Sequence, residues 1–406
     1  MLLKLAFRNV WRNKRRTFIT LAAVLFAVFL SSVLRSFQKG AWDNVFDTSI
    51  NTFFGYVQIH KDGFWDDQTI DNSFESIEVL EDDLLSIPNV KGVAPRLESF
   101  ALASAGELTQ GVAVIGVDPI KEDRLTGIRG KIEQGSYLKR GGCIIAEGIA
   151  SKLKLSVTDT LVLISQGFRG ANAAGKYPIN GIFRYALPDL NKTLVFLDLP
   201  SAQELYAAEG RLTSLALHIE KSTQVADIVD KVKAVVNQED YEVMDYKELM
   251  PELVQARQLD EGGGYVTIGI LYILIAFAIF GTIIMMTQER RYEYGVLTSI
   301  GMGRWTLFSV TFLETIILAV AGTLLRILLA MPVVYYLHIH PLDLSKMGND
   351  ATAAFENFGM EPIVPAAFSA SVFARQALII FLITVLLGIY PLYKILKLNP
   401  VTAMRS

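Results

Sequence analysis

Residues 265–287 read YVTIGILYILIAFAIFGTIIMMT, a run without a single charged side chain. About 20 consecutive apolar residues in a helix cross the roughly 30 Å hydrocarbon layer of a membrane, so this stretch predicts a transmembrane helix. Three further long apolar runs occupy residues 17–34, 305–337 and 377–393. The chain as a whole is 51% hydrophobic and 19% charged over 406 residues, which is too apolar for an ordinary soluble protein of this size. We therefore expect an α-helical membrane protein with four transmembrane helices.

The segment between the first and second runs, residues 38–262, has ordinary globular composition and is long enough to bury its own core. It holds 22 Lys and Arg against 34 Asp and Glu, a net charge of −12, whereas the rest of the chain holds 16 against 7, a net charge of +9. Short loops rich in Lys and Arg stay in the cytoplasm. The large segment is therefore expected outside, and both basic termini inside. The single cysteine, Cys143, excludes an intrachain disulfide.

These patterns predict the following order of segments. A basic cytoplasmic helix (1–16) precedes the first span (17–37), the external domain (38–262) and the second span (263–287). A short cytoplasmic amphipathic helix (288–304), the third span (305–337), a short external loop (338–374), the fourth span (375–393) and a cytoplasmic tail (394–406) follow. The first run could instead be a cleaved signal peptide, but its length and the lack of a small-x-small site near 31–35 favour a retained anchor.

Within the external domain, two strand–helix–strand patterns flank a central part. The first covers a strand at 56–60, a helix at 75–86 and a strand at 90–95; the second covers 212–219, 225–236 and 241–244. They predict one α+β part built from both ends of the domain, at about 45–116 and 212–250, around a mainly β insertion at about 117–200. Three glycines at 262–264 indicate either a hinge or a simple linker before the second span.

One stretch, GANAAGKY at residues 170–177, comes within one residue of the phosphate-binding loop G-x-x-x-x-G-K-[ST]. Such a loop needs a hydroxyl for magnesium and a following helix, yet Tyr177 replaces the hydroxyl, and Pro178 with Gly181 disfavours a helix. The stretch is better explained as the tip of a protruding hairpin. We therefore expect no nucleotide bound to this chain.

Signals for other chemistry are weak. His338, His340 and Asp343 form a sparse metal-binding pattern, and an ordinary external loop is the better interpretation. The sequence has no G-x-S-x-G elbow, H-E-x-x-H helix or Cys-x-x-Cys pair. We expect no catalytic residue, no metal site and no nucleic-acid partner.

Several motifs resemble the FtsX-like permease family of ABC transporters, and most closely its lipoprotein-releasing branch, the LolC and LolE type. They are LAFRNVWRNKRRTFIT (5–20), CIIAEGIASKLKLSVTDTLVLI (143–164), RRYEYGVLTSIGMGRW (290–305) and LNPVTAMRS (398–406). In the second motif, Thr158 stands where the family usually has Gly. The resemblance implies the type VII, MacB-like architecture: four spans and a periplasmic domain with a porter-like α+β part and a β-rich Sabre-like insertion.

The motif at 290–305 has an apolar stripe of Val296, Leu297 and Ile300 at helical spacing, which predicts a short amphipathic helix at the inner membrane surface. On residues alone it could be a simple turn between two spans. The resemblance implies that it is the coupling helix that docks into a separate ATPase. The candidate coupling residues are Glu293, Gly295, Leu297, Gly301 and Arg304.

The resemblance further implies a mechanical cycle in the bacterial inner membrane, with both termini cytoplasmic. A cytoplasmic ABC ATPase dimer would bind ATP and magnesium and move two permeases, identical or paralogous. They would draw a lipoprotein from the outer leaflet and pass it to a periplasmic chaperone held by the hairpin at 166–179. The candidate chaperone-binding residues are Phe168, Arg169, Tyr177 and Pro178. Alternatives are a macrolide-exporter-type pump for small molecules or peptides, and an FtsX-like regulator of cell-wall hydrolases.

Arg326 is the unusual charge in the third apolar run. If that span begins near Trp305, Arg326 lies near its outer end and its side chain can reach the interface. The sharper hypothesis is a mid-membrane charge with a functional partner. Glu314 lies about 18 Å away along the same helix, too far for a direct pair.

Overall fold

The computed structural model describes residues 14–76, 78–185, 187–220, 224–347, 363–399 and 403. The chain divides into two compact units. The helical unit comprises Met1–Asp43, Ala256–Leu342 and Ile363–Ser406, and the α/β unit comprises Asn44–Gln255 and Asp343–Pro362.

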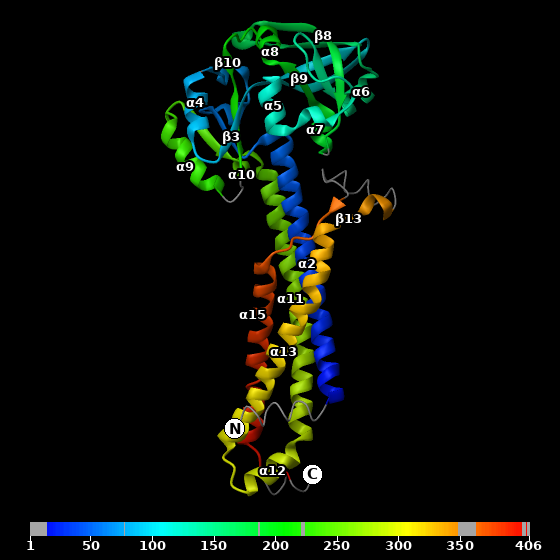
Figure 1. Ribbon diagram of the computed structural model, residues 1–406, viewed down its shortest axis with the longest axis vertical. Coiled ribbons are helices and arrows are strands. Elements are labelled where there is room, and N and C mark those ends of the chain that lie inside the picture. The colour runs from blue at the N-terminus through cyan, green and yellow to red at the C-terminus, as the bar shows by residue number, and fades with distance from the viewer. Residues whose placement is uncertain are drawn as a thin grey trace. The chain divides into compact units, whose positions relative to one another are not determined.

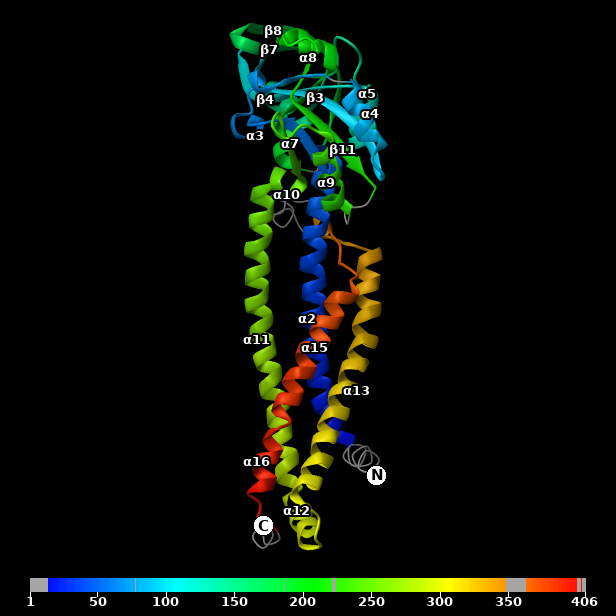
Figure 2. The ribbon, with the colours of Figure 1, turned by 90° about the vertical axis from the view of Figure 1, so that its left-hand side faces the viewer.

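Long helices build the helical unit (Figure 1, Figure 2). They are α2 (Lys14–Ser49), α11 (Pro251–Glu289), α13 (Arg304–Ile339) and α15 (Ala370–Leu387), with the shorter α12 (Arg291–Ser299) and α16 (Tyr390–Leu396). In the described part of the chain, three segments are long and apolar enough to cross a membrane: Pro251–Glu289, Arg304–Ile339 and Ala370–Leu396. The first predicted span, 17–37, falls on α2, where most side chains up to residue 28 lie outside the described residues. The count of four spans therefore stays a prediction.

These helices pack through small clusters of buried apolar side chains. Ile275, Ile279 and Ile283 of α11 meet Ile380 of α15. Ala330 and Val334 of α13 meet Phe373 of α15, and Phe29, Val33 and Phe37 of α2 pack against them. A buried hydrogen bond from Ser31 Oγ to Gln376 Oε1, 2.8 Å long, joins α2 to α15. Polar bonds of this kind hold helices together where lipid removes the hydrophobic driving force.

The three glycines at 262–264 form neither a linker nor a break, because α11 runs through them as one helix from Pro251. At Gly264 a Cβ atom would lie 2.5 Å from the side-chain amide of Gln38, so the glycine permits the close approach of α2. Next to it, Gln38 Nε2 donates to the backbone carbonyl of Asp260 at 2.8 Å, and Trp42 Nε1 donates to Asp260 Oδ2 at 2.7 Å. Helix packing therefore replaces the hinge or linker that the sequence suggests.

The first part of the α/β unit joins both ends of its sequence in one antiparallel sheet. Its elements are β1 (Val57–Lys61), α4 (Glu78–Ser86), β3 (Val90–Ala105), β11 (Ser214–Ile219), α9 (Val225–Val235) and β12 (Tyr241–Asp245). The strands lie in the order β12-β1-β11-β3. Two strand–helix–strand units interleaved in this way form a ferredoxin-like arrangement.

The second part of the α/β unit is a ring of strands. It uses β3 again, with β4 (Leu108–Val117), β9 (Leu194–Asp198), β6 (Cys143–Ala146), β8 (Asn172–Phe183) and β7 (Thr160–Gln166). Each pairs with the next, and β7 pairs with β3 to close the ring, while β5 (Ile132–Gly135) lies at the edge of β8. β4 and the second half of β3 fall within the predicted 45–116 part, and both pair with strands of the ring. The long strand β3 pairs with β11 in the first part and with β4 and β7 in the ring. Local sequence patterns do not reveal such a shared strand.

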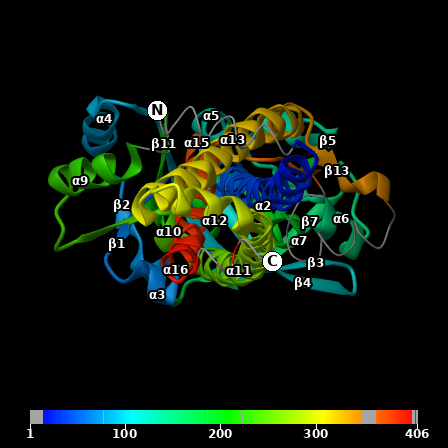
Figure 3. The same cartoon turned by 90° about the horizontal axis from the view of Figure 1, so that it is seen from below.

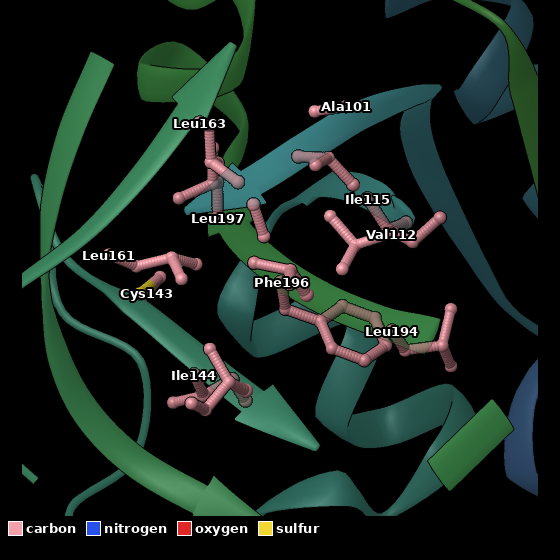
Figure 4. Packing of buried hydrophobic residues seen from close by; sticks show 14 of the residues in the cluster. Ala101, Val112, Ile115, Cys143, Ile144, Leu161, Leu163, Leu194, Phe196 and Leu197 are labelled. Carbon is pink, nitrogen blue, oxygen red and sulfur yellow. The ribbon is translucent and has the colours of Figure 1, made fainter. Parts of the chain in front are cut away.

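The ring encloses the main apolar core (Figure 4). Leu161 and Leu163 of β7, Ile144 of β6 and Phe196 of β9 point into it and are almost fully buried. The alternation of inward and outward side chains along each strand fills a barrel of this size without leaving a channel. This core fills the interior of the ring.

The remaining elements are short. They are α3 (Phe64–Asp67), α5 (Pro119–Thr126), α6 (Glu147–Leu153), α7 (Pro188–Thr193), α8 (Leu199–Leu205), α10 (Tyr246–Leu249), β2 (Phe74–Glu75), β10 (Arg211–Leu212), β13 (Leu342–Asp343) and β14 (Ile363–Val364). A π-helical turn, η1 (Ile50–Phe54), continues directly from α2 and ends at Gly55. Gly55 has φ +71°, a conformation that favours glycine.

Candidate functional site

The helix α12 is held against the ends of α13 and α16 by its own apolar face. Tyr294 of α12, Leu307 of α13 and Ile395 of α16 form a buried cluster, and Leu297 packs against it. Figure 3 shows α12 and α16 next to each other. The hydroxyl of Tyr294 lies 3.3 Å from Thr311 Oγ1 on α13. Of the stripe seen in the sequence, Leu297 therefore faces the neighbouring helices.

The end of α12 is fixed by a Schellman motif at Gly301. The Met302 N–H donates to the Leu297 carbonyl at 3.0 Å, and the Gly301 N–H donates to the Thr298 carbonyl at 3.1 Å. Gly301 has φ +98°, which a residue with a side chain rarely adopts. Met302 and Leu297 also join the apolar cluster, as this motif favours. Gly301 thus ends the helix and turns the chain into α13.

Arg304, the first residue of α13, ties that helix to the end of α16. Its Nη1 donates to the Leu396 carbonyl at 2.8 Å, and its Nη2 donates to the Leu398 carbonyl at 3.2 Å. A cation at these carbonyls satisfies acceptors that have no partner within the helix. Of the predicted coupling residues, Leu297, Gly301 and Arg304 therefore maintain the shape of the site.

A buried ion pair that the sequence motifs do not predict lies beside this cluster. Arg290, between α11 and α12, donates from Nη1 to Glu314 Oε2 on α13, and both side chains are almost fully buried. A carboxylate inside an apolar helix is costly unless it is paired. In the sequence, Glu314 as the single acid in the third apolar run indicates a need for a buried cation. Arg290, just after the second apolar run, is that cation.

The outward surface of this region is apolar and aromatic. Tyr292 is 57% exposed, Ile300 78% and Trp305 65%. Glu293 is half-buried in the first turn of α12, and Gly295 is buried. Ile300, which the sequence groups with Val296 and Leu297 in one apolar stripe, is the C-cap of α12 and faces outward. These three exposed apolar and aromatic side chains are called the α12 patch below.

Beside the α12 patch, a cavity of about 320 Å³ opens between α11, α12 and α16. Arg291, Lys394 and Lys397 line it together with Tyr390 and Tyr393. The ammonium of Lys397 lies 4.3 Å from the ring centre of Tyr393. This end of the helical unit thus combines apolar contact area with positive charge.

Arg326 belongs to α13. Its side chain lies outside the described residues, so both hypotheses about it stay predictions. The structure does show where Glu314 is engaged, because Arg290 pairs with it.

The hairpin of β7 and β8 does not protrude as the sequence predicts. Its strands pair from Thr160 with Pro178 to Gln166 with Asn172, and β7 also pairs with β3. At the turn, the Phe168 N–H donates to the Tyr206 carbonyl at 2.8 Å. The buried alternation of Leu161 and Leu163 explains this, because one face of the hairpin forms part of the ring core.

The predicted chaperone-binding residues separate into two places. Phe168 and Arg169 lie at the turn, where Phe168 is half-buried and Arg169 is exposed. Tyr177 and Pro178 lie far along β8, close to its pairing with Thr160. They do not form one cluster.

The stretch that resembles a phosphate-binding loop lies in a β-strand, and the two histidines contact a backbone carbonyl and an aromatic ring. Lys176 lies in β8, which continues as a strand to Phe183, so no helix N-terminus follows it. His338 Nδ1 lies 2.9 Å from the Ala366 carbonyl, and His340 packs against the ring of Tyr336. Over the described residues, no group of three or more metal-binding side chains occurs.

Comparison with known proteins places this arrangement in a family. Residues 265–400 match the FtsX-like permease C-terminal domain. This range includes α12 and most of the three segments that are long and apolar enough to cross a membrane. This match assigns the C-terminal third of the chain to the FtsX-like permeases. The permease is 24% identical over 246 residues to an ABC transporter permease protein of Mycobacterium tuberculosis. It is 34% identical over 88 residues to the lipoprotein-releasing system transmembrane protein LolE of Haemophilus influenzae, and 22% identical over 295 residues to an ABC transporter permease of Methanocaldococcus jannaschii.

These matches cover 59%, 21% and 68% of the permease, and 28%, 21% and 65% of the respective relatives. Among solved structures, the permease is similar to the extracellular domain of YknZ, a noncanonic ABC-type transporter from Gram-positive bacteria, with a TM-score of 0.35 and 14% identity over 47% of this chain and 99% of that one. It is also similar to the periplasmic region of MacB from Actinobacillus actinomycetemcomitans, with a TM-score of 0.36 and 12% identity over 52% and 97%.

Proposed function

We propose that this permease couples ATP hydrolysis by a separate ABC ATPase dimer to the extraction of lipoproteins from the outer leaflet of the bacterial inner membrane. In this proposal it works with a second permease, identical or paralogous, and delivers the lipoprotein to a periplasmic chaperone. The α12 end lies in the cytoplasm with both termini. The observation that carries the proposal is an α12 that is rigidly attached to its own helices and carries an exposed apolar patch.

Rigid attachment is what a force-transmitting element needs. A push on α12 reaches α13 through the Tyr294 and Leu307 contact, and reaches α16 through Ile395 and the two bonds of Arg304. Packed interiors transmit such a displacement because they are as dense as crystals of small molecules. The α12 patch supplies the surface on which the ATPase would press, since exposed aromatic side chains are common anchors of protein interfaces.

ATP and magnesium belong to the partner in this proposal. The lipoprotein substrate is supported by the stretch similar to LolE, whose name states a role in lipoprotein release. For the chaperone, the exposed Arg169 at the hairpin turn is the better candidate contact, with Phe168 beside it.

The test is recovery of the ATPase from native membranes with tagged permease variants. Ile300→Asp places a charge at the most exposed residue of the α12 patch, and Glu293→Lys reverses a charge in the first turn of α12. We expect each to lower the recovered ATPase by about tenfold or more, as for a hot-spot residue. The matched control is Ile120→Asp in the α/β unit, where Ile120 is 67% exposed. Equal recovery with Ile300→Asp and with the control refutes the docking surface.

The substrate is tested separately, by release of a labelled lipoprotein from spheroplasts to added periplasmic extract. We expect Ile300→Asp to abolish release while Ile120→Asp keeps it. If Ile300→Asp loses the ATPase but release continues, the permease acts on another cargo, and the lipoprotein proposal is wrong.

A further inference from the structure

A second cavity, of about 310 Å³, lies between α2, α11 and α15, at the ends of α11 and α15 that are far from α12 and α16. Four basic side chains line it: Arg35 and Lys39 of α2, Arg257 of α11 and Arg375 of α15. Glu261 is the acidic residue in its lining.

Two of the four cations are neutralised by neighbours. Lys39 pairs with Asp43 at 2.5 Å, and Arg257 pairs with Glu261 at 3.0 Å and with Asp43 at 3.7 Å. The carboxylates of Asp43 and Glu261 thus balance the charges of Lys39 and Arg257. The cavity keeps the charge of the remaining two.

Those two are Arg35 and Arg375, and within the described residues neither has a carboxylate at ion-pair distance. Arg35 donates to Gln38 Oε1 at 2.5 Å, and its guanidinium lies 4.6 Å from the ring centre of Tyr265. Both partners leave the charge of Arg35 in place. Arg375 is exposed on the second turn of α15. Two positive charges on different helices therefore face one cavity.

Apart from Ser371 and Gln376, the rest of the lining is apolar or aromatic. Ile268 and Tyr272 follow Tyr265 along one face of α11, and Val372 and Ile379 flank Arg375 on α15. Spacings of three and four residues place these side chains on a common helix face. Both helices belong to segments apolar enough to cross a membrane. The cavity thus combines basic and apolar lining residues, which is the polarity of an amphiphilic ligand.

We propose that this cavity binds the phosphate of an anionic phospholipid, with Arg35 and Arg375 as its two ligands and an acyl chain along Ile268 and Ile379. Guanidinium groups suit this role because their planar donors match phosphate oxygens in pairs. The bound phosphate relieves repulsion between the two arginines and bridges α2 to α15. The site lies at the end of the helices opposite to α12, and it does not depend on which cargo the permease moves.

The experiment uses the full-length permease in nanodiscs of phosphatidylcholine that contain a photoactivatable phosphatidylglycerol. Cross-linked peptides are quantified by mass spectrometry. We expect labelling of α2, α11 or α15 near the cavity, and a loss of about tenfold or more in Arg35→Gln/Arg375→Gln, since each basic residue near the surface contributes measurably to anionic-lipid binding. The control Lys91→Gln/Lys231→Gln removes the same charge from the α/β unit and is expected to label like the unaltered protein.

Three outcomes overturn the proposal. Equal labelling by a photoactivatable phosphatidylcholine shows that the cavity does not recognise the anionic headgroup. Displacement by millimolar inorganic phosphate shows a site for free phosphate. Unchanged labelling of the double arginine variant shows that these residues are not the ligands. Thermal unfolding of each variant is measured alongside, and Arg35→Lys/Arg375→Lys, which keeps both charges, is expected to retain most of the labelling if the double Gln variant proves unstable.

Discussion

Replacing Arg96 with Met is expected to destabilise the α/β unit far more than removing a surface charge from the same strand. Arg96 lies in β3 and is fully buried with Glu122 of α5. Its Nε donates to Glu122 Oε2 at 2.9 Å, and its Nη2 donates to Glu122 Oε1 at 2.7 Å and to the Phe53 carbonyl in η1 at 2.7 Å. The substitution leaves a buried carboxylate and a buried carbonyl without these donors.

The size of the effect follows from that arrangement. Breaking a buried pair by removing one partner costs about 3–5 kcal/mol, whereas replacing both partners with apolar residues is close to neutral. For a domain of this size, about 1 kcal/mol shifts Tm by about 2–4 °C. We expect Arg96→Met to lower the Tm of the α/β unit by about 10 °C. Arg96→Met/Glu122→Leu is expected to recover most of that loss.

The protein carries its own reporter for this measurement. Cys143 is the single cysteine and is fully buried in the ring core. Burial also raises the pKa of its thiol to about 12, so it stays protonated and unreactive in the folded state. A fluorogenic thiol reagent, added during a temperature ramp in detergent, therefore reports unfolding of the α/β unit.

The control is Lys91→Met, which removes an exposed pair with Glu220 from the same strand. The Lys91 and Glu220 side chains are 54% and 48% exposed and 3.2 Å apart, so their pair contributes about 0–1 kcal/mol. An Arg96→Met protein that unfolds within about 2 °C of Lys91→Met would refute the reasoning. So would a double variant no more stable than Arg96→Met, because the loss would then not come from the uncompensated carboxylate.

Three further predictions concern the α/β unit. Burial lowers the pKa of His60 from 6.5 to about 4, so below pH 6.5 the unfolded chain binds a proton that the folded domain does not. Stability is then expected to fall by about 3 kcal/mol between pH 6.5 and 4, and His60→Asn, which can keep a donor near the Thr213 carbonyl, should flatten that slope in thiol-exposure melts. Thr158 has φ +81°, so Thr158→Gly is expected to raise stability by about 1 kcal/mol; a lower Tm contradicts this. At Gly167 a Cβ would lie 2.5 Å from the Tyr206 carbonyl, whereas at Gly111 it meets nothing within 4 Å. Gly167→Ala, and not Gly111→Ala, is expected to speed hydrogen exchange at the Phe168 amide; equal exchange in both rules out the packed turn.

The motif at 290–305 shows how far local patterns lead. Apolar spacing predicts a short helix there, and Arg291–Ser299 is helical. The same pattern cannot tell which apolar residues face inward, because that depends on where α13 and α16 lie. Leu297 therefore packs inside, while Ile300, assigned to the same stripe, is 78% exposed.

For the hairpin of β7 and β8, local patterns also do not show which segments pack together. Its Gly and Ala residues are locally typical of a flexible tip. Pairing of β7 with both β3 and β8 instead makes the segment part of a closed ring. The partner strand β3 is distant in sequence, so no local signal announces the contact.

The sequence by itself determined that the chain has membrane-spanning segments around a large α/β domain, because apolar runs, charge asymmetry and strand–helix–strand patterns are local properties of composition and spacing. Only the tertiary structure decided which distant residues meet: Arg290 with Glu314, Arg96 with Glu122, and Arg35 with Arg375 around one cavity. These encounters depend on how helices and strands pack across long stretches of chain. Burial then changes what the charges cost, and so decides which of them support the fold and which are left for a ligand.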